Sequence, residues 1–243
     1  MMLRATIWRD LRWRLVAATL LAAPLAALVT WSYVGRARAG DTVPRDYVAY
    51  LDDAWFHLPG PSSVFLLAAV VLAAGGGLVR PREQIAYLLA LPTSRRRLLF
   101  TYVSAVLVAL AVSVLVVDVI LATGAWSTGV PLPLAPLLVR SVCVFAAAAV
   151  WVCITVGVLV LVRYPVLALA LVLGAVMLLP ANRFRVEVPA AAPTAILARW
   201  DAWAFADPRA WEGGVPFASL LVATALAVGG ILLALDRLRR FEP

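Results

Sequence analysis

The sequence contains no lysine, so all of its basic side chains are arginines. Without lysine the chain cannot build a Walker-type phosphate-binding loop, which ends in a lysine that reaches the phosphates, or use a Schiff-base nucleophile. The single histidine, His57, rules out paired-histidine zinc sites, and no Gly-x-Ser-x-Gly motif accompanies it. We therefore expect the chain to be no enzyme, to hydrolyse no ATP itself, and to bind no metal or other cofactor.

Charged residues and cysteines are also scarce. Only 14% of the 243 residues are charged, whereas 64% are hydrophobic, and a soluble domain has about a quarter charged residues. The two cysteines, Cys143 and Cys153, lie in one apolar run and would be turned about 80° from each other on a helix. We interpret them as small apolar side chains rather than as a bridge or a metal pair.

Long apolar runs are what the sequence does have. Six of them approach or exceed the length that a helix needs to cross about 30 Å of hydrocarbon: residues 15–34, 64–79, 98–122, 137–162, 165–179 and 217–235. We predict an all-α polytopic membrane protein with six transmembrane helices, in which residues 1–243 form one transmembrane domain. The run 165–179 is the shortest, so whether it crosses fully is left open.

The placement of arginine predicts the orientation, because cytoplasmic loops carry an excess of basic residues. With both termini inside, the cytoplasmic segments hold Arg4, Arg9, Arg12, Arg14, Arg80, Arg82, Arg95, Arg96, Arg97, Arg163, Arg237, Arg239 and Arg240, against Asp10, Glu83, Asp236 and Glu242. The outer segments hold basic and acidic side chains in equal number. We expect a multi-pass protein of the plasma (inner) membrane, with anionic lipid rather than nucleic acid as the partner of these arginines.

Two amphipathic segments flank this core. Leu3, Ile7 and Leu11 recur at helical spacing, which predicts an N-terminal interfacial helix on the inner leaflet or, equally well, the basic start of the first span. Residues 35–61 are expected to form a solvated outer loop. Residues 190–212 carry Trp200 and Trp203 at helical spacing and predict a helix at the outer leaflet.

Small residues recur every fourth position in the second and third runs, a pattern that lets helices approach closely in lipid. They are Ala69, Ala73 and Gly77 in the second run and Ala105, Ala109 and Ser113 in the third.

Two charges fall inside the predicted membrane. Asp118 lies about one turn inside the outer end of the third run, and Arg140 about one turn inside the start of the fourth. Each would cost roughly 2.5–3.5 kcal/mol at the bilayer centre and less near the interface. Their matched depth predicts a structural ion pair; a role of Asp118 in a substrate pathway and simple interfacial solvation are the alternatives.

The most informative segment is the charged insert at residues 80–97. Arg82 and Glu83 stand in its first turn, Leu88 and Leu89 form an apolar side, and Arg95, Arg96 and Arg97 close it. An oxygen of Thr93 or Ser94 can cap the helix that follows. On the predicted topology the insert lies at the cytoplasmic surface, where it is either an ordinary basic loop or a docking site.

The insert resembles the permease subunits of type 2 ATP-binding-cassette exporters. The resemblance consists of Glu83, then Leu88-Leu89, then Leu91-Pro92-Thr93-Ser94-Arg95, together with six spans and both ends inside, so it covers nearly the whole chain. The departure is Arg80-Pro81-Arg82, where family members often have Glu and Gly. The resemblance implies that the insert is a coupling helix for a separate ATPase, with contact candidates Arg82, Glu83, Leu88, Leu89, Leu91, Pro92, Thr93, Ser94, Arg95, Arg96 and Arg97.

On this resemblance we expect a permease subunit that moves a hydrophobic or amphipathic substrate. Its partners would be two copies of a cytoplasmic ATPase, which bind the ATP and Mg, and a second permease chain of the same or a sister sequence. The alternative is a non-transport immunity, regulatory or assembly subunit that uses the same insert to dock a cytoplasmic partner.

Overall fold

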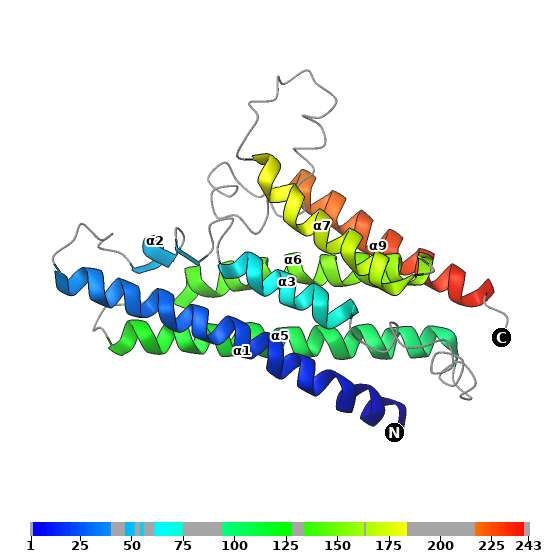
Figure 1. Ribbon diagram of the computed structural model, residues 1–243, viewed down its shortest axis with the longest axis horizontal. Coiled ribbons are helices and arrows are strands. Elements are labelled where there is room, and N and C mark those ends of the chain that lie inside the picture. The colour runs from blue at the N-terminus through cyan, green and yellow to red at the C-terminus, as the bar shows by residue number, and fades with distance from the viewer. Residues whose placement is uncertain are drawn as a thin grey trace, which may run out of the picture.

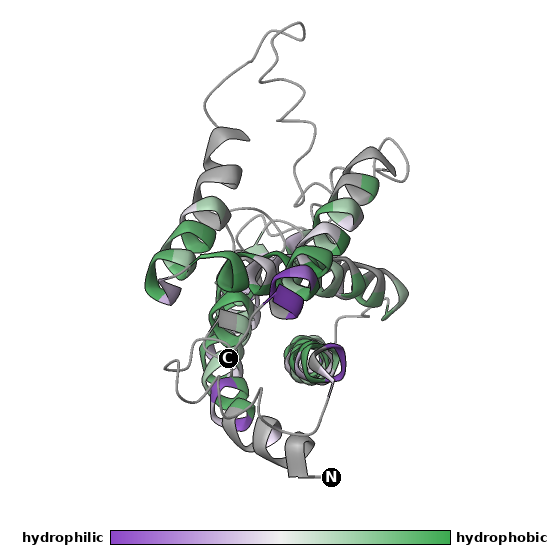
Figure 2. Cartoon of the chain, turned by 90° about the vertical axis from the view of Figure 1, so that its right-hand side faces the viewer, coloured by the Kyte–Doolittle hydropathy of each residue, from purple (hydrophilic) through white to green (hydrophobic). Residues whose placement is uncertain are grey.

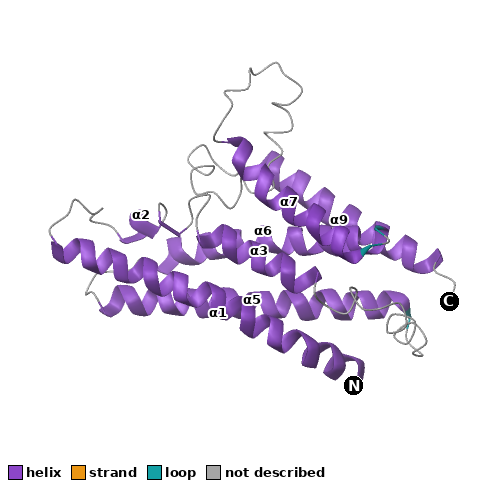
Figure 3. Ribbon diagram, viewed as in Figure 1, coloured by secondary structure: helices purple, strands orange, loops and turns teal. Residues whose placement is uncertain are grey.

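A computed structural model of the chain describes residues 2–39, 47–51, 54–55, 61–74, 94–127, 134–162, 164–183 and 217–240. These residues form helices and short connections, without a strand in these ranges (Figure 3). The helices are α1 (Met2–Ala39), α2 (Tyr47–Leu51), α3 (Pro61–Ala74), α5 (Arg95–Ser127), α6 (Leu134–Leu161), α7 (Pro165–Arg183) and α9 (Phe217–Arg240).

The long helices run back and forth between two ends of a bundle (Figure 1). The start of α1, the start of α5 and the end of α9 lie at the same end, near both chain termini. We call it the arginine end, after Arg12, Arg14, Arg96, Arg97 and Arg237. Figure 2 views the bundle from this end and shows hydrophilic residues at the tips of helices whose bodies are hydrophobic.

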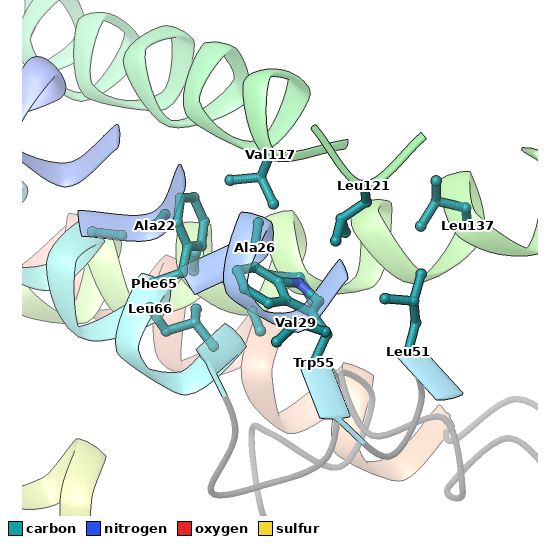
Figure 4. Packing of buried hydrophobic residues seen from close by; sticks show 14 of the residues in the cluster. Ala22, Ala26, Val29, Leu51, Trp55, Phe65, Leu66, Val117, Leu121 and Leu137 are labelled. Carbon is teal, nitrogen blue, oxygen red and sulfur yellow. The ribbon is translucent and has the colours of Figure 1, made fainter. Parts of the chain in front are cut away.

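Helix α6 is the centre of the bundle. It packs against α3, α5, α7 and α9, while α1 packs against α5 and α3. Away from the arginine end the core includes Tyr47, Trp55, Phe65, Val117 and Leu121, and Figure 4 shows several of these side chains converging from different elements. A second cluster nearer the arginine end joins residues of α1, α3, α5, α6 and α9, among them Leu11, Leu99, Tyr102, Val156 and Ala234.

Within the described residues, three helical stretches are long and apolar enough to cross a membrane: Leu11–Arg36, Arg96–Ser127 and Val144–Leu161. They confirm the first, third and fourth predicted runs as apolar helices of membrane-spanning length. Two shorter apolar helical stretches, Val64–Ala73 and Pro165–Ala175, coincide with the second and fifth runs, and α9 coincides with the sixth. That the chain crosses the bilayer six times stays a prediction.

The surface of α1 is arranged for a bilayer. Trp13 is 68% exposed and Trp31 is 74% exposed, and they lie roughly five turns apart, about 27 Å along the helix. Leu20, Leu21 and Leu28 are exposed between them. Indole rings favour the two membrane interfaces and leucine the hydrocarbon, so this spacing matches a hydrocarbon layer about 30 Å thick.

The N-terminal segment and the first run are continuous in the structure. They form the single helix α1, and Leu11 from the predicted interfacial face is only 1% exposed because it packs with Leu99 and Tyr102 of α5. This part of the N-terminal segment therefore lies against the bundle.

The expectation of a solvated loop over residues 35–61 is wrong for its middle part. Tyr47 and Leu51 of α2 are fully buried, and Trp55 in the following turn is 3% exposed. Three aromatic rings and a leucine in nine residues favour packing on the bundle over exposure to water. The predicted outer helix at 190–212 lies outside the described residues.

Helix α5 extends beyond the third predicted run, to Ser127. Near this end Thr123 donates hydrogen bonds to the carbonyl oxygens of Val119 and Ile120, and Ser127 donates one to Gly124. Because these hydroxyls donate hydrogen bonds to carbonyl oxygens of their own helix, the helix can continue beyond the end of the apolar run. Asp118 is consequently more than two turns inside the end of α5, instead of about one.

Candidate functional site

The start of α5 at the arginine end carries the described part of the insert. Ser94 Oγ accepts a hydrogen bond of 3.3 Å from the backbone N–H of Arg97, and the Ser94 carbonyl accepts one of 3.0 Å from Leu98. Ser94 is therefore the N-cap, which confirms one of the two candidates for that role. The side chains of Arg96 and Arg97 are exposed.

Cationic residues in a first helical turn oppose the helix dipole, and the first turn of α5 has no acidic residue. The Ser94 cap holds this turn together, so the arginines remain on a defined helix tip. The rest of the candidate contact set lies outside the described residues: Arg82, Glu83, Leu88, Leu89, Leu91, Pro92 and Thr93; of Arg95, the backbone alone is described.

One hydrogen bond links the two helices that flank the insert. Tyr102 Oη on α5 donates a bond of 2.5 Å to the carbonyl oxygen of Ala73, in the last turn of α3. Tyr102 is 2% exposed, and it lies about 12 Å along α5 from Ser94. Tyr102 was not among the residues predicted from the sequence. The feature that could have indicated it is a hydroxyl near the start of an otherwise apolar run, because the end of a neighbouring helix has unpaired carbonyl oxygens that can accept a hydrogen bond.

A second polar site lies between α5 and α6. Ser141 Oγ donates a hydrogen bond of 2.6 Å to Asp118 Oδ1, and Ser141 is 5% exposed. Arg140 precedes Ser141 on α6, but its side chain is outside the described part, so the predicted Asp118–Arg140 ion pair stays a prediction. Ser141 was missed in the sequence because it is a small polar residue beside a more conspicuous charge.

Asp118 and Ser141 border a small pocket. Its other walls are Trp55, Phe65 from α3, Val114 and Val117 from α5, and Val144 from α6. Figure 4 shows Trp55, Phe65 and Val117 in the same cluster. The space that a water-sized group can occupy in it is about 10 Å³. The pocket thus combines one carboxylate and one hydroxyl with aromatic and aliphatic walls.

An aromatic clasp holds α2 on the bundle. The hydroxyls of Tyr47 and Thr30 share a hydrogen bond of 3.0 Å, those of Tyr50 and Ser32 share one of 2.5 Å, and the Tyr33 ring lies 4.9 Å from that of Tyr47. Burial raises the pKa of Tyr47 above its usual value, although the bond to Thr30 partly opposes this. The Tyr47 phenol therefore stays neutral and suited to a buried position. Trp55, four residues after the end of α2, belongs to the same buried cluster as Tyr47 and Leu51 and lines the pocket.

Helices α6 and α9 meet at two glycines. A Cβ on Gly157 would lie 2.8 Å from the Cα and from the carbonyl oxygen of Gly230, and a Cβ on Gly230 would lie 2.9 Å from the carbonyl oxygen of Cys153. Such contact is closer than two side-chain-bearing positions allow, and small residues permit it in membranes. Cys153 is a free cysteine.

Most of the described residues of the predicted small-residue stripes are buried, but Ala105 is only half-buried, and Gly77 lies outside the described residues. Ala69, Ala73, Ala109 and Ser113 are each at most 2% exposed. Ser113 and Thr19 share a hydrogen bond of 3.1 Å between α5 and α1. The stripe on α5 therefore contributes a polar contact between helices as well as close packing.

These features define a helical membrane protein, with a basic end, a capped helix after a charged insert, and a half-buried carboxylate between helices. No family model, curated protein or solved structure matches the chain. Within the described residues no group of three metal-binding side chains occurs.

Proposed function

We propose that the chain is the membrane-spanning permease subunit of an ATP-binding-cassette exporter, which moves a hydrophobic or amphipathic substrate. A separate cytoplasmic ATPase would supply the energy and bind the insert at residues 80–97. The observation that carries the proposal is the placement of the capped start of α5, with exposed Arg96 and Arg97, at the arginine end beside both chain termini. The six long helices α1, α3, α5, α6, α7 and α9 would then each cross the bilayer, with the arginine end in the cytoplasm.

A coupling segment must pass its displacement to the transmembrane helices. The insert joins α3 to α5, and Tyr102 bonds the end of α3 to α5 two turns from the Ser94 cap. Helix α5 also packs along α1, and α3 packs against α6. A displacement of the insert would therefore be transmitted to α3, α5, α1 and α6 through direct contacts between helices.

We further propose that two permease chains form the working unit, because six helices enclose little space for a pathway. Each chain would bind one ATPase subunit. ATP binding would draw the two ATPases together and shift the dimer between inward-open and outward-open states, with the differential affinity of ATP for the closed arrangement driving the change.

Copurification from mild detergent tests the proposal. The triple variant Arg95→Ala/Arg96→Ala/Arg97→Ala and the variant Glu83→Ala should each lose the ATPase that accompanies the wild type, because they remove the proposed contacts. Arg36→Ala/Arg38→Ala is a control, since both arginines are exposed and both lie in the last turn of α1, away from the arginine end, and this variant should retain the ATPase.

Four outcomes would be informative. Loss confined to the insert variants supports the docking proposal, whereas an equal loss in the control, or no ATPase with the wild type, contradicts it. An ATPase that copurifies while deletion of the gene changes no resistance or export phenotype would instead favour the non-transport docking subunit.

A further inference from the structure

The Asp118 pocket has the composition of a site for a small cation. A carboxylate has about four directions in which it can accept hydrogen bonds, and Ser141 occupies one of them on Oδ1. Asp118 is half-buried between α5 and α6, where a negative charge is costly without a positive partner. The remaining acceptor capacity of the carboxylate suits a group that carries several N–H donors.

The other walls of the pocket restrict the kind of cation that can bind. Trp55 and Phe65 offer aromatic rings, which attract cations, while Val114, Val117 and Val144 offer no oxygen. Calcium and magnesium need six or more oxygen ligands, including water, and the described side chains of the pocket provide oxygens from Asp118 and Ser141 alone. An ammonium group needs fewer partners and tolerates aromatic and aliphatic neighbours.

The size of the pocket limits the ligand further. The usable space of about 10 Å³ is the least that holds one water molecule. A primary ammonium head, –NH3+, is about as large as a water molecule, whereas the three methyl groups of a trimethylammonium head need more space than one water molecule does. The rest of the ligand must remain outside the pocket, among the apolar side chains of a membrane protein.

We propose that this pocket binds the primary ammonium head of an amphipathic amine. Asp118 supplies the charge, Ser141 orients the carboxylate, and Trp55 supplies an aromatic wall for the head. The amine can come from a phospholipid headgroup or from a free amphiphile. This site is additional to the ATPase-docking insert, and its existence does not depend on the export function.

The test uses the purified full chain in detergent with two single-chain probes. Dodecylammonium and dodecyltrimethylammonium carry the same tail and charge but differ in head size. We expect dodecylammonium to raise the midpoint of thermal unfolding in a saturable way, and dodecyltrimethylammonium to have no such effect. Asp118→Asn should weaken the apparent affinity for dodecylammonium about ten- to a hundredfold, since a charge-assisted hydrogen bond is lost.

A second pair of variants retains Asp118, so the proposal can still be tested if Asp118→Asn does not fold. Val144→Ile adds one methylene to a pocket wall and should abolish the response to dodecylammonium while the carboxylate remains. Val112→Ile adds the same group on α5 where the side chain is exposed and should leave the response unchanged.

Two nanodisc preparations distinguish the sources of the amine. If a phospholipid headgroup is the ligand, discs containing phosphatidylethanolamine should stabilise the wild type, but not Asp118→Asn, relative to discs containing phosphatidylcholine. If the ligand is a free amphiphile, the two disc types should give equal stability and an equal dodecylammonium response.

The proposal is overturned if both probes act alike, or if Asp118→Asn and Val144→Ile respond as the wild type does. It is also overturned if dodecylammonium acts only on Arg140→Gln, because Arg140 would then be the native partner of the carboxylate. None of these results depends on an ATPase, so failure here is separable from failure of the export proposal.

Discussion

At the scale of single residues, glycine determines how close the central helix can come to α9. At Gly157 and Gly230 backbone meets backbone, so the two helices approach closely at this crossing. In lipid, where water does not drive helices together, such packing is a main source of association.

We predict that Gly157→Ala and Gly230→Ala each destabilise the fold by about 1–3 kcal/mol, because the added Cβ would overlap the backbone of the facing helix. Gly229→Ala is the control. Its Cβ would meet nothing within 4 Å, and alanine is the better helix former by about 1 kcal/mol. Unfolding in mixed micelles measures all three, and equal destabilisation by Gly229→Ala would contradict the assignment of the close contact to Gly157 and Gly230.

Contacts between single residues on different helices could not be predicted from the sequence. Gly157 and Gly230 are far apart in the chain, and nothing in either run predicts that α6 and α9 are neighbours. Asp118 was recognisable as an unusual charge, but its partner Ser141 became apparent only from the pairing of α5 with α6. A residue's own polarity is readable from the sequence, whereas the identity of its contact is a property of the packing.

At the scale of elements, Thr30 joins three segments. Its hydroxyl donates to the Ala26 carbonyl of α1 and shares a hydrogen bond with Tyr47 of α2, while its methyl group faces Gly124 of α5. The aromatic clasp and the contact between α1 and α5 therefore depend on the same side chain.

A double-mutant cycle tests this shared role. Gly124→Ala should cost about 1–3 kcal/mol, because its Cβ would overlap Thr30 Cγ2. Thr30→Ser removes that methyl and retains the hydroxyl, so the double variant should recover much of the loss. Gly35→Ala, whose Cβ would meet nothing within 4 Å, is the matched control. Additive losses in unfolding experiments would show that the two positions do not compete for the same space.

The elements were predictable to different degrees. Continuous apolar runs identify α1, α5 and α6 because a membrane helix needs a long apolar surface, yet the ends of α5 are set by Ser94, Thr123 and Ser127, which bond to the helix itself. Helix α2 has only five residues, too few for a periodic signal. It becomes visible only through the burial of Tyr47 and Leu51 against other helices.

At the scale of the whole molecule, docking of an ATPase requires that the arginine end lie on the cytoplasmic side of the membrane. The start of α5, the arginine-rich end of α9 and the chain termini share that end (Figure 1). The positive-inside tendency assigns it to the cytoplasm, where an ATPase could reach the insert. If the orientation were reversed, the insert would face outward and the export proposal would fail.

Cysteine labelling of oriented membrane vesicles measures this orientation directly. In a background with Cys143→Ala and Cys153→Ala, Ser94→Cys and Ser127→Cys place single thiols at exposed positions on opposite ends of α5. A membrane-impermeant maleimide should label Ser94→Cys only in inside-out vesicles and Ser127→Cys only in right-side-out vesicles. Labelling of Ser94→Cys from the outside of right-side-out vesicles would contradict the account.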